Sequence, residues 1–164
     1  MPFELQNLGL SREEEKQRVE SALRLVDLNG FEKSFPYELS GGMKQRVGIA
    51  RALVTNPDIL LADEPFAAID AMTREAMQGE MERIVMETGQ TCVFITHSID
   101  EAILLGDRVV VISYRPGKIK EIVDIDFPRP RMSNSEVKTS KKYAELRDHI
   151  WGLVKDEAAQ SNRG

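Results

Sequence analysis

The chain has 164 residues, of which 41% are hydrophobic and 30% charged, a composition typical of a folded globular protein rather than a disordered one. Its formal net charge of -5 provides no basic excess, so a nucleic acid is not an expected partner. The single cysteine, Cys92, excludes a disulfide framework, and its apolar neighbours predict a small core residue. No apolar run approaches the roughly 20 residues that span a bilayer, so any membrane role is expected to come through a partner.

Residues 1–57 are expected to form a helical region. Ser11 followed by Glu14 is a capping box, which predicts a helix that begins after Ser11 and ends near residues 29–30, where Asn and Gly stand. After a loop, a second helix is predicted from residue 40 to about residue 55, because apolar residues recur on one face and an Asn-Pro pair follows.

Residues 58–126 are expected to form an α/β region. Four strands are predicted, at 59–62, 91–96, 108–113 and 118–124, the last two joined by a turn at 115–117. The first is a continuous apolar run, which is typical of a strand buried on both faces, and the second is also expected to be buried. A long helix is predicted between Asp70 and Gly89, and a short one over 100–105. Strands that alternate with helices imply a parallel sheet with helices packed on it, so the predicted fold class is α/β.

Residues 127–164 are expected to form a linker and a C-terminal helix. The Phe-Pro-Arg-Pro-Arg sequence at 127–131 predicts an extended linker. An amphipathic helix is predicted over 141–158, with an apolar face made of Leu146, Ile150, Trp151 and Val154.

Two adjacent carboxylates follow the first predicted strand. Asp63 and Glu64 stand at its C-terminal end, where ligands bind in open parallel sheets. Because side chains alternate along a strand, the two point in different directions, so one can hold Mg²⁺ while the other faces a water. The alternative for the pair taken alone is a solvated acidic turn.

A serine and two glycines open the second predicted helix. The first N–H groups of a helix have no partner inside it and form an anion site. Gly41 and Gly42 let a phosphate approach the backbone without obstruction by a Cβ, and the hydroxyl of Ser40 can donate to a phosphate oxygen. A plain helix cap is the alternative, and it does not exclude binding.

Two further polar residues stand at the ends of predicted elements. His97 follows the second predicted strand, beside the strand that leads to Glu64, so its imidazole could reach a γ-phosphate or the attacking water. A lone histidine is usually structural, but its position at a strand end favours function. Asp70 precedes the long helix and is expected, in part, to be a plain N-cap.

Taken together, these motifs resemble those of the nucleotide-binding subunit of an ABC transporter. Residues 39–45 resemble the signature motif, 59–64 the Walker B strand, 65–70 the D-loop, and His97 the switch histidine. Four further segments are similar to importer ATPases of the nitrate/sulfonate/taurine type: 63–66, 96–102, 115–119 and 127–131. The resemblance implies part of a P-loop NTPase domain together with part of the helical signature subdomain.

The resemblance also implies roles for individual residues. Glu64 would polarise the attacking water, and His97 would contact the γ-phosphate. Asp63 would help to hold Mg²⁺, and Asp70 would communicate across a dimer. The residues expected to contact the ATP held by the opposite subunit are Ser40, Gly41, Gly42 and Gln45.

The partners implied by the resemblance are a second ATPase subunit and membrane permease subunits. A periplasmic or lipoprotein solute-binding protein would be an indirect partner. The implied location is the cytoplasm, with the subunit bound peripherally to the cytoplasmic face of the inner membrane. The transported solute does not follow from the sequence, because the solute-binding protein and the membrane subunits select it.

The sequence departs from complete subunits of this family in one large respect. No G-x-x-x-x-G-K-[ST] phosphate loop occurs in it, and the Gly117-Lys118 pair lacks the rest of that motif. The chain is therefore expected to be the C-terminal portion of a subunit, without the Walker A loop and the Q-loop, and to hydrolyse no ATP alone. The missing strands also predict an exposed apolar edge or face on the sheet.

Two other interpretations use the same residues. The first is a non-catalytic interaction module that pairs with an intact ATPase subunit. The second is a DNA-repair or translation ATPase that shares the signature motif. Coiled-coil insertions, a second cassette and basic faces are typical of that second class, and none is visible in the sequence.

Overall fold

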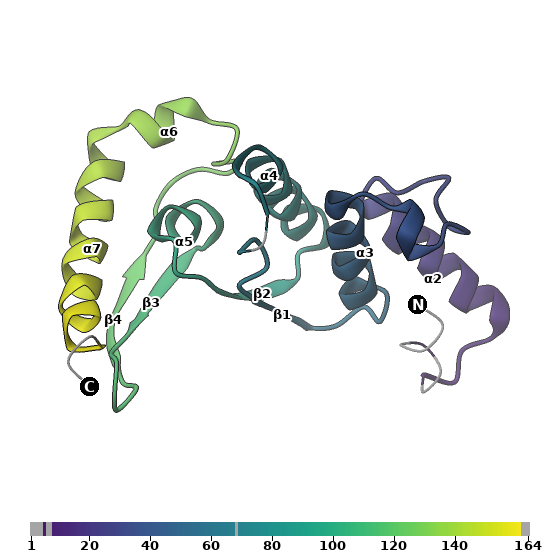
Figure 1. Cartoon of the computed structure of the whole chain (residues 1–164), viewed down its shortest axis with the longest axis horizontal. Coiled ribbons are helices and arrows are strands. Elements are labelled where there is room, and N and C mark those ends of the chain that lie inside the picture. Colours follow the sequence, from purple (N-terminus) through teal and green to yellow (C-terminus); the bar gives the residue numbers. More distant parts are fainter. Residues whose placement is uncertain (1–4, 6–7, 68, 162–164) are drawn as a thin grey trace. The chain divides into compact units, whose positions relative to one another are not determined.

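The computed structural model describes residues 5, 8–67 and 69–161, with side chains described as far as Lys155. The chain divides into two compact units (Figure 1). The first comprises Met1–Ala62 and Phe66–Val93, and the second comprises Asp63–Pro65 and Phe94–Gly164. The division of the sequence at residues 57 and 126 stays a prediction.

Three helices dominate the first unit: α2 (Arg12–Leu25), α3 (Gly41–Leu53) and α4 (Ala71–Thr88), with a short 3-10 helix, η2 (Pro36–Glu38), before α3. Each α-helix begins where a polar side chain accepts a hydrogen bond from its first turn. Ser11 forms the predicted capping box with Glu14 at α2, Ser40 caps α3, and Asp70 caps α4. The predicted helix starts are therefore confirmed.

The predicted end of α2 was wrong. The helix stops at Leu25, because the Asp27 N–H donates to the Arg24 carbonyl and the Leu28 N–H donates to the Leu23 carbonyl. This is the Schellman pattern, with Asp27 in the left-handed conformation (φ 51°) that glycine usually supplies. The sequence offered Gly30 as a terminator, but an aspartate three residues earlier takes that place.

The strands β1 (Ile59–Asp63) and β2 (Thr91–Ile95) form a two-stranded parallel sheet. The prediction that both are buried on two faces was wrong. Side chains alternate along β1, so that Leu60 and Ala62 are buried whereas Ile59 and Leu61 are 61% and 66% exposed. In β2 no side chain is fully buried, and Cys92, expected in the core, is only half-buried, although burial does raise the pKa of its thiol. One face of β1 is therefore apolar and exposed, in agreement with the predicted exposed apolar edge or face of the sheet.

The second unit is built around an antiparallel hairpin. Strands β3 (Arg108–Ile112) and β4 (Ile119–Asp124) pair in a register that sets Val109 opposite Val123. Helix α5 (Ile99–Leu105) precedes the hairpin, and α6 (Ser135–Thr139) and α7 (Lys141–Ser161) follow it, with α7 running beside the two strands (Figure 1). These elements share one apolar core, made of Ile103, Leu104, Val111, Val123, Ile125, Met132, Val137, Tyr143 and Ile150.

The segment 127–131 has no regular secondary structure, as predicted, but it is anchored rather than a free linker. The guanidinium of Arg131 is 3% exposed and donates to the carbonyl oxygens of Phe127, Gly106 and Ile125. The C-terminal helix forms as predicted, but Trp151, expected on its apolar face, is 56% exposed. None of the helices described is both long enough and apolar enough to traverse a bilayer.

Candidate functional site

Glu64 stands immediately after β1 in an unusual backbone conformation. Its φ is 46°, a left-handed value that costs a residue with a side chain of order 1–3 kcal/mol. Its N–H donates to the carbonyl of Ile95 at 2.9 Å, so the chain is fixed just beyond the carboxyl ends of both strands. Such strain is retained where the surrounding structure demands a particular direction of the side chain.

One carboxylate oxygen of Glu64 is buried without a hydrogen bond. Among the described residues no donor meets hydrogen-bond geometry with Oε1, although His97 Nε2 lies within ion-pair distance, at 3.0 Å. The side chain as a whole is 31% exposed, so solvent reaches part of it. A buried acceptor that the chain leaves unsatisfied is costly, and it is free to accept from a group that the protein itself does not supply.

His97 follows β2 and brings its imidazole to this carboxylate. Its side chain is 95% exposed, so very little packing holds the ring. The backbone around it is fixed instead, since the hydroxyl of Thr96 accepts from the Ser98 N–H at 3.0 Å and donates to Glu101 Oε2 at 2.5 Å. The sequence prediction that His97 and Glu64 lie together at the strand ends is thus matched by a direct contact.

Asp63 ends β1 and its side chain is exposed. Within the described ranges no cluster of three or more histidine, cysteine, aspartate or glutamate side chains could hold a metal ion. This donor set does not form an all-protein metal site. It fits Mg²⁺ bound in the way typical of nucleotide sites, where one or two carboxylates share the ion with substrate phosphates and waters.

The serine and glycines at the start of α3 lie on the surface of the first unit. Ser40 and Gly41 are exposed, and the hydroxyl of Ser40 accepts from the Met43 N–H at 3.3 Å. Neither glycine is left-handed, and a Cβ added at Gly41 would meet no atom within 4 Å. Among the described residues there is therefore no steric reason for glycine at position 41.

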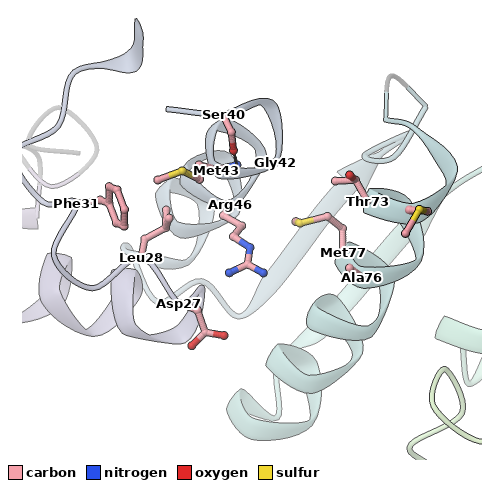
Figure 2. Close-up of a pocket in the computed structure, with 11 residues that line it drawn as sticks. Asp27, Leu28, Phe31, Ser40, Gly42, Met43, Arg46, Thr73, Ala76 and Met77 are labelled. Atoms are coloured by element: carbon pink, nitrogen blue, oxygen red, sulfur yellow. Dashed lines mark hydrogen bonds between the residues drawn. The ribbon is translucent and has the colours of Figure 1, made fainter. Parts of the chain in front are cut away.

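Gly42 borders a pocket of about 480 Å³ in the same unit. Figure 2 shows the N-cap Ser40 with Met43 and Arg46 of α3 on one side of it, and Thr73 and Met77 of α4 on the other. The guanidinium of Arg46 extends into the space between the two helices and donates to the Val26 carbonyl at 3.2 Å. A Cβ at Gly42 would lie 3.4 Å from the Thr73 methyl group, so this glycine packs closely against the start of α4.

Asp70 caps α4 at the end of the segment that resembles a D-loop. Its carboxylate accepts from the Thr73 N–H at 3.1 Å, and this bond, with one from the Thr73 hydroxyl, lowers the pKa of Asp70. The predicted N-cap is confirmed. Ala68 in the same segment lies outside the described residues.

Residues 3–67 match the family described as ABC transporter. The taurine import ATP-binding protein TauB of Rhizobium johnstonii is 51% identical over 149 residues, which are 89% of this chain and 57% of that protein. The aliphatic sulfonates import ATP-binding protein SsuB of Bacillus cereus is 44% identical over 144 residues, 88% of this chain and 55% of that protein. The chain belongs to the ABC transporter family.

A solved ABC structure supports the fold. The dimeric structure of MJ0796, a bacterial ABC transporter cassette, superposes with a TM-score of 0.56 at 35% identity, covering 73% of this chain and 51% of that chain. The α/β fold class and the resemblance to a P-loop NTPase are thereby confirmed. The chain spans little more than half the length of the relatives that it matches.

The predicted ABC motif residues divide between the two units. Asp63, Glu64 and His97 belong to the second unit, where Glu64 and His97 are in direct contact. The signature residues and Asp70 belong to the first unit, where Gln45 is half-buried. The sequence indicated no role for Glu101, a buried carboxylate five positions after Thr96. Nothing in the sequence distinguishes it from its acidic neighbour Asp100 in the same short helix.

Proposed function

We propose that this chain serves in ATP binding and hydrolysis by the ATPase subunit of an ABC importer, with a sulfonate such as taurine as the solute. The observation that supports the proposal best is the Glu64 carboxylate. It lies at the carboxyl end of a Walker B strand, with one buried oxygen unbonded and an imidazole nitrogen 3.0 Å away. The names of the taurine and sulfonate import relatives support the class of solute.

In this proposal each polar residue at the strand ends has a separate task. Glu64 accepts a hydrogen bond from the attacking water through Oε1, which the chain leaves without a donor. His97 donates from its exposed ring to the γ-phosphate. Asp63 holds Mg²⁺, which when bound neutralises charge on the phosphate oxygens. The strained backbone of Glu64 fixes the direction of its carboxylate before substrate arrives.

The start of α3 acts on the nucleotide of a second subunit. The exposed N–H groups of its first turn and the hydroxyl of Ser40 bind phosphate oxygens, and Gly41 allows their close approach. Gln45 contacts the same nucleotide, and Asp70 connects the two subunits. The dimeric form of the solved cassette supports this arrangement.

The remaining partners follow from the importer assignment. Membrane permease subunits bind the ATPase subunit on the cytoplasmic face of the inner membrane, and a solute-binding protein delivers the sulfonate to them. The import function printed in the names of the relatives supports this assignment.

The chain of 164 residues is proposed to hydrolyse no ATP alone, because the sequence contains no phosphate loop to hold the β- and γ-phosphates. Purified chain assayed with ATP and Mg²⁺ should release no phosphate above the background of Glu64→Gln. Mg²⁺-dependent turnover that Glu64→Gln abolishes would contradict this part of the proposal.

A complementation assay tests the signature face. An intact importer ATPase subunit whose own signature serine has been replaced by arginine is mixed with the chain. Wild-type chain should restore ATP turnover to the mixture, and chain with Ser40→Arg should not. Equal turnover with both chains would contradict a role for Ser40. Because the restored turnover takes place on the phosphate loop of the intact subunit, it should survive Glu64→Gln in the chain.

A further inference from the structure

The hydroxyl of Thr96, the residue before His97, makes hydrogen bonds to two residues that follow His97. It donates to Glu101 Oε2 at 2.5 Å and accepts from the Ser98 N–H at 3.0 Å. Thr96 and Ser98, on either side of His97, are therefore joined through the hydroxyl oxygen of Thr96. This fixes the backbone from which the His97 side chain extends.

Glu101, which accepts the hydrogen bond from the Thr96 hydroxyl, is itself held in place. Glu101 is 8% exposed and lies in the first turn of α5, where its N–H donates to the Ser98 hydroxyl at 3.3 Å. The neighbouring Asp100 accepts from the Tyr143 hydroxyl at 2.8 Å and from Arg147 Nε at 3.0 Å, so α7 holds the same turn of α5. Thr96 is thus bonded to a buried group on an anchored helix rather than to a mobile one.

Side-chain packing does not fix the position of the His97 imidazole. With 95% of its side chain exposed, His97 has almost no apolar contact, and ordering a free side chain costs conformational entropy. Its 3.0 Å approach to Glu64 Oε1 must therefore depend on the backbone on either side of it.

We infer that Thr96 and Glu101 are a positioning pair that holds His97 against Glu64. The inference rests on the proposed function, in which His97 and Glu64 act on the nucleotide. Neither Thr96 nor Glu101 touches the reacting atoms. They act through His97, and removing their hydrogen bond separates the imidazole from the carboxylate.

The test observes the imidazole directly and requires no turnover. The sequence contains two histidines, so the chain labelled with ¹⁵N in histidine gives two sets of ring signals at one fixed pH. His149, whose Nε2 lies 2.7 Å from Glu121 Oε1, is the internal reference. The difference in the His97 Nε2 shift between wild type and Glu64→Gln measures the contact with Glu64.

Four variants of the pair and one control test the positioning role. Thr96→Val keeps the shape but removes the hydroxyl, and it should move the His97 signal to the position seen in Glu64→Gln. Thr96→Ser keeps the hydroxyl and should leave the signal at the wild-type position. Glu101→Met should have the effect of Thr96→Val, and the double variant should add nothing to either, because both remove the same bond. Thr88→Val, which removes a 2.8 Å hydrogen bond to Ile84 in α4, is the matched control and should leave His97 unchanged.

Each result has one meaning. Wild-type shifts retained in Thr96→Val, or lost equally in Thr88→Val, would overturn the positioning role while leaving the proposed function intact. An identical His97 signal in wild type and Glu64→Gln would show that the contact does not form, and would count against the proposed function as well. A signal lost in Thr96→Val and restored in Thr96→Ser establishes the pair.

Discussion

The hydroxyl of Tyr143 donates to Asp100 Oδ1 at 2.8 Å, and this bond joins α7 to the first turn of α5. The same oxygen accepts from Arg147 Nε at 3.0 Å. Tyr143 is 7% exposed and packs in the core of the second unit, with its ring 6.3 Å from that of Phe127. The C-terminal helix thus contributes a nearly buried hydrogen bond to the segment that follows His97.

Tyr143→Phe should therefore destabilise the chain without changing its fold. A hydrogen bond to a charged group contributes about 1.5–3 kcal/mol, and the loss should fall near the lower limit because Arg147 remains bonded to Asp100. Urea unfolding followed by circular dichroism measures the loss. Tyr37→Phe, at a side chain that is 78% exposed, is the control and should change the stability by less than about 0.5 kcal/mol. Equal losses in the two variants would contradict the role of the Tyr143 bond.

The same tyrosine should make the stability fall in alkali. Burial, and then the Asp100 carboxylate, raise the pKa of Tyr143 above its ordinary value of about 10. Above that pH the unfolded chain releases the phenolic proton while the folded chain keeps it, so the contribution is fully present below about pH 10 and is lost as the pH rises further. Urea midpoints measured across this range should fall less steeply in Tyr143→Phe than in wild type. Parallel curves would show that the phenol is not shielded in the folded state.

Arg131 should be among the least replaceable residues of the second unit. Its guanidinium donates to Gly106, Ile125 and Phe127 carbonyl oxygens and to Asp107 Oδ1. Arg131→Met should cost about 2–5 kcal/mol, because each buried acceptor left unsatisfied costs roughly 1–3 kcal/mol.

The control for Arg131 lies two residues away. Arg129 also binds Asp107, at 3.0 Å, but its side chain is 18% exposed against 3% for Arg131, so solvent can replace part of its bonding. Arg129→Met should cost less than half as much by urea unfolding. The reverse order would show that burial is not what distinguishes the two arginines.

The sequence predicted the starts of the helices because each start depends on a few adjacent residues. Ser11, Ser40 and Asp70 all cap the helices expected of them. The predicted end of α2 was wrong because Asp27, rather than the glycine at 30, takes the left-handed position that ends the helix. The residues around Asp27 did not indicate that it would adopt the left-handed conformation.

Burial was harder to predict than secondary structure, because it depends on elements distant in sequence. The apolar run of β1 correctly predicted a strand, but an apolar run does not reveal whether both faces are covered. Trp151 was predicted on an apolar face but is exposed. Arg131 is buried and donates hydrogen bonds to Gly106 and Ile125, which follow α5 and β4 and are distant from it in sequence. In the site, residues adjacent in known motifs were predicted, whereas the Thr96–Glu101 bond required the structure.

The open face of β1 predicts association of the isolated chain. Leu61 is 66% exposed beside Ile59, whereas Leu60 on the other face is 6% exposed. Leu61→Lys should reduce concentration-dependent association, measured by light scattering, and leave the melting curve nearly unchanged. Leu60→Lys is the matched control and should unfold the chain, because it buries a charge without a partner. Unfolding by Leu61→Lys would mean that the two faces of the strand are assigned the wrong way round.

Replacing Gly41 should separate an effect on stability from an effect on function. A Cβ there meets nothing within 4 Å, and the residue is the first of α3, so Gly41→Ala should leave the fold intact and raise the stability by up to roughly 0.5–1 kcal/mol. If the backbone at 41 receives a phosphate of a partner subunit, the same methyl group obstructs it. In the complementation assay with a signature-defective subunit, turnover should fall at least about tenfold, the effect of a loss of about 1.4 kcal/mol in transition-state stabilisation.

Gly48 provides the matched control for this prediction. It lies in the same helix, is exposed, and would also accept a Cβ without any atom within 4 Å. Gly48→Ala should give a similar gain in stability with no loss of turnover, because nothing is expected to approach the backbone at that position. If Gly41→Ala supports turnover as well as Gly48→Ala does, then no external group needs the space at residue 41, and the start of α3 is a helix cap alone.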